Sequence, residues 1–218
     1  MATLESVWEQ REQVIYPQRF GAVSRGIFVL TMELFRDTFS QTEVDPRWLH
    51  IGVFEFAPTR ERKSWLYVSS GLTNPWETDP SDFKLDDWSW LGDELVFEAS
   101  EQSKWAIDFL GKMTAYQLLL AHGRFGEPSL FAAGDTTSLG GSINGDPESA
   151  LRFVLFGAPV GFDSHFQLES GKAGFIQIVG ITETERAFAR EHGGEALRNR
   201  LIERHAYPVT NPIRAAAL

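Results

Sequence analysis

Residues 172–185 read KAGFIQIVGITETE, and this stretch decides the fold class. Its first ten residues form a nearly continuous apolar run, which is typical of a central strand covered on both faces. Thr182 and Glu185 then follow with the spacing of a capping box, so a helix is predicted to begin here and to continue to about His192. A sheet that is covered on both faces is therefore expected.

Further strands are predicted on the N-terminal side of this stretch, where β-branched and aromatic residues cluster between turn formers. They span residues 26–35, 48–58, 64–72, 93–100 and 151–160. The polar link RERK at 60–63 predicts a hairpin between the second and third of these strands. In the fourth strand Glu94 and Glu98 share one face, and this pattern predicts that both carboxylates face solvent.

Helices are predicted near the start, the middle and the end of the chain. One covers 3–16 and stops at Pro17, one covers 104–123 with an apolar stripe, and one covers 195–206. The Gly-rich segment 124–148 is predicted to be turn-like, with one strand near SLFAA at 129–133. Paired strands and separate helices predict a single α+β domain over residues 1–218, with a mixed, largely antiparallel sheet packed by helices.

Composition narrows the classes of function. The chain has 218 residues, a formal net charge of −10 and no cysteine. An acidic chain is a poor candidate for binding nucleic acid, and it suits a basic partner better. The first residues lack the pattern of a signal peptide and no apolar run is long enough for a membrane helix, so a cytoplasmic location without membrane contact is expected.

Motifs for chemistry are incomplete. Ser69 and Ser70 lack the preceding glycine of a nucleophile elbow, and Ser142 is a near miss because its second glycine comes one place late. The five histidines show no metal-ligand spacing, and the Gly-rich loops lack the lysine of a phosphate loop. No catalytic residue, metal or cofactor is predicted from these patterns.

Aromatic content is the unusual feature. Trp65, Trp76, Trp88 and Trp90 fall within 26 residues and alternate with acidic residues. Trp65 lies in a predicted strand and is expected in the core. Trp76 and Trp88 lie in polar, turn-rich sequence, where an interface and plain packing are both open interpretations.

Five segments together resemble the Suppressor of fused domain family, over roughly residues 20–214. The segments are PTRERKSWLYVSSGLTNPW (58–76), DELVFEAS (93–100), WAIDFLGKMTAYQLLL (105–120), GFIQIVGITETE (174–185) and LRNRLIERHAYPVTNPIRAA (197–216). This resemblance implies a compact α+β domain that binds protein partners and has no known catalysis. Small single-domain relatives look bacterial, and they have been proposed to be immunity proteins that neutralise toxins.

The resemblance also points to a site. In the two-domain eukaryotic relative, a short peptide of a zinc-finger transcription factor is gripped between the domains. The aromatic residue at that site aligns with Trp76, and an acidic residue aligns near Asp86 or Asp87. Thr73 and Asn74 stand where Ser-Asp is usual, so this turn lacks a charge that the family carries.

The favoured hypothesis is a non-catalytic protein-binding module, with an immunity protein as one form that the resemblance implies. Its partner would be a protein, such as a basic toxin domain or peptide, and the chain would be a monomer or a weak homodimer. The expected contact residues are Trp76, Asp79, Asp86, Asp87 and Trp88. The alternatives are a hydrolase that uses loop carboxylates or Ser142, and a structural subunit.

Overall fold

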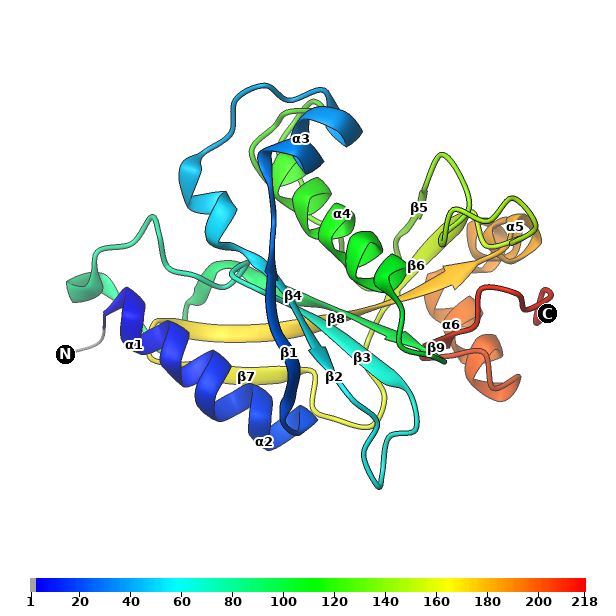
Figure 1. The fold of residues 1–218 in the computed structure, drawn as a ribbon, viewed down its shortest axis with the longest axis horizontal. Coiled ribbons are helices and arrows are strands. Elements are labelled where there is room, and N and C mark those ends of the chain that lie inside the picture. Colours follow the sequence, from blue (N-terminus) through cyan, green and yellow to red (C-terminus); the bar gives the residue numbers. More distant parts are fainter. Residues whose placement is uncertain (1–2) are drawn as a thin grey trace.

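One mixed β-sheet runs through the molecule, and helices cover both of its faces (Figure 1). The computed structural model describes residues 3–218. The strands are hydrogen-bonded in the order β1-β2-β3-β4-β8-β6-β5, while β7 pairs with β8 and β9 with β4. Only the β4–β8 and β4–β9 pairs are parallel among the strand pairs of residues 3–218. The predicted α+β class with a mixed, largely antiparallel sheet is confirmed.

The strands are β1 Val23–Val29, β2 Gly52–Phe56, β3 Trp65–Ser70, β4 Trp88–Ala99, β5 Thr136–Ser138, β6 Phe153–Gly157, β7 His165–Leu168, β8 Gly171–Ile181 and β9 Val209–Thr210. The helices are α1 Leu4–Glu9, the π-helix η1 Gln10–Ile15, α2 Tyr16–Phe20, α3 Met32–Phe39, the 3-10 helices η2 Pro46–His50 and η3 Pro80–Asp82, α4 Lys104–Ala121, α5 Glu183–His192 and α6 Gly194–Glu203.

The stretch at 172–185 behaves as its pattern predicts. β8 lies between β4 and β6, and its side chains are buried on both faces of the sheet. Thr182 and Glu185 form the capping box that opens α5, with the Thr182 N–H donating to Glu185 Oε2 at 2.7 Å. The hairpin predicted at 60–63 also joins β2 to β3, which are antiparallel.

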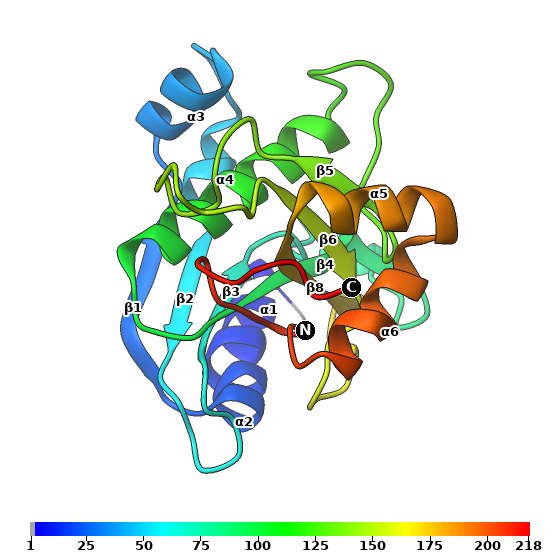
Figure 2. The ribbon, with the colours of Figure 1, turned by 90° about the vertical axis from the view of Figure 1, so that its right-hand side faces the viewer.

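Three apolar clusters fill the layers. The largest lies between α4 and one face of the sheet and contains Phe97, Leu110 and Ile178. On the opposite face, a second cluster lies under α1, η1 and α2, and a third lies under α5 and α6 (Figure 2). None of the helices in residues 3–218 has the length and apolarity that a membrane crossing requires.

The N-terminal helix does not stop at Pro17, and that prediction is wrong. Helical structure runs from Leu4 to Phe20 through α1, η1 and α2. The middle segment is a π-helix, in which the Tyr16 N–H donates to the carbonyl of Arg11, five residues back. Pro17 follows directly inside this continuous helix, and the wider turn accommodates a residue that has no N–H to donate to the preceding turn.

Residues 26–35 were predicted as one strand, and the structure divides them. β1 ends at Val29, and Thr31 caps α3 by accepting a hydrogen bond from the Leu34 N–H. This local cap overrides the β propensity of the run. The predicted strand at 129–133 is absent from the structure, and the short β5 lies at 136–138 instead. β7, which was not predicted, pairs with the start of β8.

Candidate functional site

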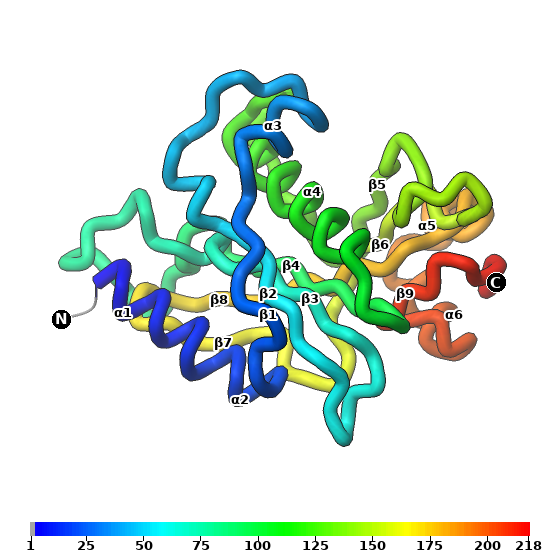
Figure 3. The backbone as a smooth tube through the Cα atoms, viewed as in Figure 1, coloured from blue at the N-terminus to red at the C-terminus, as the bar shows by residue number. Residues whose placement is uncertain are grey.

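The candidate site is the segment from Gly71 to Trp88, which connects β3 to β4 and lies beside the N-terminal helix (Figure 3). Gly71 opens it with a φ of +128°, a conformation that suits glycine. A Cβ added there would lie 2.7 Å from Cγ1 of Ile51. The backbone at Gly71 therefore passes too close to Ile51, the residue before β2, for any other residue without a shift.

The carboxylate of Glu94 is hydrogen-bonded to the backbone at the start of this segment. Its Oε1 accepts hydrogen bonds from the N–H of Gly71 at 2.9 Å, the N–H of Thr73 at 3.0 Å and the Thr73 hydroxyl at 2.8 Å. Ser69 donates to the other carboxylate oxygen. The sequence pattern predicted a solvent-facing Glu94, and that prediction is wrong, because the side chain is fully buried under the N-terminal helix.

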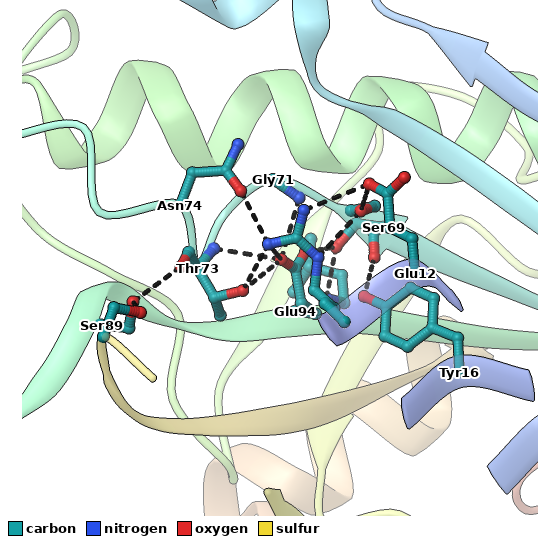
Figure 4. A network of polar contacts seen from close by, with 12 residues as sticks. Glu12, Tyr16, Ser69, Gly71, Thr73, Asn74, Ser89 and Glu94 are labelled. Carbon is teal, nitrogen blue, oxygen red and sulfur yellow. Dashed lines mark hydrogen bonds and ion pairs between the residues drawn. The ribbon is translucent and has the colours of Figure 1, made fainter. Parts of the chain in front are cut away.

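Arg11 of the π-helix completes this network, in which Figure 4 shows Glu94, Thr73 and Asn74. Its guanidinium donates to Ser70 Oγ at 3.0 Å, Thr73 Oγ1 at 3.1 Å and Asn74 Oδ1 at 2.7 Å. It also lies 3.8 Å from Glu94 Oε1, and neither side chain is exposed to solvent. The negative charge of the buried carboxylate and the positive charge of the buried guanidinium therefore compensate each other.

The two serines of this turn are part of the same network. The Ser70 hydroxyl donates to Glu12 at 2.6 Å, and the carbonyl of Ser69 accepts from the Tyr16 hydroxyl at 2.6 Å. Burial raises the pKa of Tyr16 well above its ordinary value, so it remains a neutral donor. Asn74 supplies an oxygen to Arg11 without adding a further buried negative charge next to Glu94.

Glu98 is the second acidic residue that the sequence pattern placed in solvent, and this prediction is also wrong. It is buried and accepts a hydrogen bond from the Ser64 hydroxyl. Burial raises the pKa of Glu98, although the hydrogen bond from Ser64 and the charge of Arg62 act in the opposite direction. Its carboxyl group therefore lies in an environment that disfavours ionisation.

Trp76 begins the outer part of the segment and is half-buried. Its ring meets that of Trp90 edge-on, with centroids 5.3 Å apart, and the guanidinium of Arg47 lies over it at 5.8 Å. Arg47 also donates to the carbonyl of Trp76 at 3.1 Å. Trp90 in turn packs near His122, 6.0 Å away. Trp76 is thus anchored on the α4 side, and Trp65, predicted in the core, is half-buried against the α4 cluster.

Trp88 lies at the other end of the segment and has different neighbours. Its side chain is 52% exposed, and its ring packs 5.9 Å from His165 of β7. Asp86 is exposed with its carboxylate 3.6 Å from Lys172, and the exposed Asp87 lies 3.8 Å from Lys84. Within residues 3–218 no ring contact joins Trp76 to Trp88, so the predicted set is spread along one segment.

Asp79 and Leu85 lie between these two ends. Asp79 caps the short helix η3 by accepting hydrogen bonds from the N–H and hydroxyl of Ser81. Leu85 is 61% exposed and was not singled out in the sequence, where a lone leucine carries no signal. An exposed leucine and an exposed tryptophan among carboxylates form an amphipathic surface, and we call residues 76–88 the acidic segment.

The groups proposed for a hydrolase do not come together. Ser142 lines a cavity of about 420 Å³ between α4 and the 138–145 loop, whose lining contains Asp108 as its one carboxylate and no histidine. At the surface, the hydroxyl oxygen of Ser164 lies 2.9 Å from Nδ1 of His165, its neighbour in the sequence. Burial raises the pKa of the nearby Asp93. For residues 3–218, no group of three or more His, Asp or Glu side chains is placed to hold a metal ion.

The fold and the site together define a small α+β domain whose candidate site is a surface segment braced by a buried ion pair. The family model described as Suppressor of fused protein (SUFU) matches residues 47–215, which is most of the chain. The chain therefore belongs to the Suppressor of fused family, and the resemblance seen in the sequence is confirmed. A search of the curated proteins finds no match to the sequence.

Solved structures of the family share the fold. The chain is similar to a SUFU homolog from Neisseria gonorrhoeae, with a TM-score of 0.65, 19% identity and 97% of each chain covered. It is similar to a chain of the Sufu–Fu complex, with a TM-score of 0.66, 16% identity, and 98% of this chain and 91% of that chain covered. Drosophila Suppressor of Fused gives a TM-score of 0.61 at 19% identity, and the match covers 77% of this chain but only 42% of that longer one.

Proposed function

We propose that this chain is a protein-binding module and that the acidic segment is its binding surface. Trp76, Asp79, Asp86, Asp87 and Trp88 are the proposed contact residues. The observation that carries the proposal is the exposure of Trp88 and Leu85 on a segment whose base is buried and held by hydrogen bonds to Glu94. A solved complex of a related fold, the Sufu–Fu complex, supports binding to a protein.

Charge indicates what kind of partner fits. Residues 77–87 carry five acidic side chains and one lysine, in a chain whose net charge is already −10. Such a surface attracts a basic partner and raises its rate of association, while the aromatic side chains supply most of the affinity. A basic peptide or a basic toxin domain is therefore the proposed partner.

The buried network gives the surface a fixed shape before binding. Glu94 and Arg11 together hold the backbone of Gly71 and Thr73 and the side chain of Asn74. A segment that is already ordered loses less conformational entropy on binding than a free loop does. The role of the network in this proposal is therefore to position Trp76 and the residues that follow it.

The more specific form of the proposal is an immunity protein that neutralises a toxin in the bacterial cytoplasm, without catalysis of its own. The whole of residues 1–218 would act as one Suppressor of fused-like domain, as a monomer or weak homodimer. The bacterial relative from Neisseria gonorrhoeae, which matches over 97% of each chain, supports a single-domain bacterial function. The acidic surface suits a basic toxin domain.

The test compares three forms of the protein in affinity purification from a lysate of the source organism. They are the wild type, the triple variant Trp88→Ala/Asp86→Asn/Asp87→Asn, and a control Glu191→Gln/Glu203→Gln that removes the same charge from exposed positions of α5 and α6. A protein recovered by the wild type and the control is then purified and titrated against all three by calorimetry.

We expect the triple variant to bind that protein at least about 100-fold more weakly, because it removes an aromatic anchor and two charges. The control should bind as the wild type does. Recovery of the same partner with equal affinity by the triple variant would show that the acidic segment is not the binding surface. An immunity role requires in addition that the partner be toxic to cells and that co-expression of this chain abolish the toxicity.

A further inference from the structure

A second surface lies at the edge of the sheet, away from the acidic segment. β1 is the terminal strand of the sheet, and Figure 2 shows it along the outer margin. Its residues are mostly exposed, and Ile27 and Val29 are 38% and 49% exposed. Exposed edge strands are templates for pairing, and proteins usually guard them with charges, prolines or covering loops.

The register shows which backbone groups are available. Ile27 lies opposite Phe54, Phe28 opposite Val53 and Val29 opposite Gly52. The Leu30 N–H donates to the carbonyl of Ile51 at 2.8 Å, so the backbone groups of Leu30 and Phe28 point toward β2. Because hydrogen-bonded residues alternate along an antiparallel strand, the N–H and C=O groups of Ile27 and Val29 point outward, away from the sheet.

β1 has few of the features that usually protect an edge strand from pairing. Residues 26–31 read GIFVLT and contain no charge and no proline. Arg25 is the one charged residue of β1, and its guanidinium forms two hydrogen bonds with the buried Glu55 of β2, at 2.8 and 2.7 Å. Its charge is thus turned toward β2. An irregularity in the register between Val23 and Ile27 restricts the free edge to the residues from Ile27 onward.

There is also room for the side chains of an added strand. A cavity of about 510 Å³ lies where β1 meets α3 and α4, and Leu34, Ile107 and Gly111 are among its lining residues. Side chains of a strand that pairs with β1 would enter this space on the α4 face. On the opposite face they would continue the apolar row of Ile27 and Val29. The edge therefore offers a row of backbone hydrogen-bond donors and acceptors, with apolar side chains on both faces of the strand.

We propose that this edge pairs with the β1 edge of a second copy of the chain, antiparallel and related by a two-fold axis centred within residues 27–29. An antiparallel two-fold pairing matches each outward donor with an outward acceptor of the other copy automatically. The surroundings are close to neutral, because α4 carries Asp108 and Lys112 together beside the edge. A basic partner, by contrast, is attracted to the acidic segment, which connects β3 to β4 and is separated from β1 by β2.

The pairing forms about four backbone hydrogen bonds and buries few side chains, so the dimer is weak. Sedimentation velocity of the whole chain from about 10 µM to about 500 µM should show a dimer fraction that rises with concentration. Val29→Lys should raise the dissociation constant at least about 10-fold, because each lysine would lie opposite Ile27 of the other copy and the two lysines would be diagonal neighbours, about 7–8 Å apart, on one face. Val160→Lys is the matched control, since Val160 is a valine of similar exposure (39%) away from β1, and it should dimerise as the wild type does.

A second measurement locates the contact directly. The chain has no cysteine, so Val29→Cys and Val160→Cys each carry a single thiol. With a short bis-maleimide, Val29→Cys should give a covalent dimer and Val160→Cys should not. A wild type that sediments as a monomer throughout, equal dimerisation of the two lysine variants, or equal cross-linking of the two cysteine variants would each overturn the proposal. The cross-linking pair decides the question even if Val29→Lys does not fold.

Discussion

Replacing Arg11 by methionine tests the buried network, because methionine keeps the aliphatic length of arginine and removes only the charge and its donors. In the wild type the guanidinium is fully buried, donates to Ser70, Thr73 and Asn74, and lies 3.8 Å from the carboxylate of Glu94. In the variant the Glu94 carboxylate stays buried without its counter-charge. Asn74 and Ser70 also lose the donor that satisfies their side-chain oxygens.

The magnitude follows from these contacts. Removing one partner of a buried ion pair costs about 3–5 kcal/mol, and Glu94 keeps hydrogen bonds from Gly71, Thr73 and Ser69, which places this case near about 3 kcal/mol. That is a large share of the roughly 5–15 kcal/mol by which domains are stable. Urea unfolding followed by tryptophan fluorescence measures it. Hydrogen exchange should show faster exchange at the Gly71 and Thr73 amides, because their acceptor is no longer held in place.

The control is a double-mutant cycle with Glu94→Gln. If the two charges compensate each other, Arg11→Met/Glu94→Gln should cost at least about 1 kcal/mol less than the sum of the two single variants. A cost below about 1 kcal/mol for Arg11→Met, or strict additivity in the cycle, would refute the view that this ion pair braces the segment. Unchanged exchange at Gly71 and Thr73 would do so independently of stability.

Two further predictions concern Glu98 and Gly71. Burial raises the pKa of Glu98 above its ordinary value of 4.5. The folded state therefore binds this proton more tightly than the unfolded state does. The free energy of unfolding consequently falls as the pH rises from 4.5 through the raised pKa. Glu98→Gln should therefore raise the Tm at pH 7 by about 2–4 °C, and this gain should vanish below pH 4.5 in thermal melts; an equal gain at every pH would contradict it. Gly71→Ala should lower the free energy of unfolding by about 2 kcal/mol in urea, because φ is +128° and the new Cβ would meet Ile51, whereas Gly141→Ala, which meets nothing within 4 Å, should change it little.

Elements with a local cause could be predicted from the sequence. The apolar run of β8 and the capping box of Thr182 and Glu185 each depend on residues that are close in the sequence, and both are present as predicted. The 60–63 hairpin has the same character, since it depends on a short polar link between two strands. Family resemblance pointed to the β3–β4 connection as a candidate site, and this remains a prediction.

Contacts between distant residues could not be predicted in this way. Alternation along β4 correctly places Glu94 and Glu98 on one face, but it cannot reveal that the N-terminal helix covers that face at Glu94. Arg11 fits the apolar stripe of its helix by spacing, yet its role depends on partners some 60 to 80 positions away in the chain. The π-helical turns that admit Pro17 have no sequence pattern of their own.

The two proposed surfaces lie on different strands, and this separation has a consequence for binding. The acidic segment connects β3 to β4, whereas the free edge belongs to β1, and β2 lies between β1 and β3. Pairing through β1 therefore uses none of the residues of the acidic segment, and a dimer presents two copies of it. A partner with two basic regions, or a partner that is itself dimeric, would then bind with an effective concentration that a monomer cannot provide. Val29→Lys should consequently weaken binding to such a partner while leaving the affinity of each single acidic segment unchanged, and Trp88→Ala should do the reverse by weakening each segment and leaving the dimer intact.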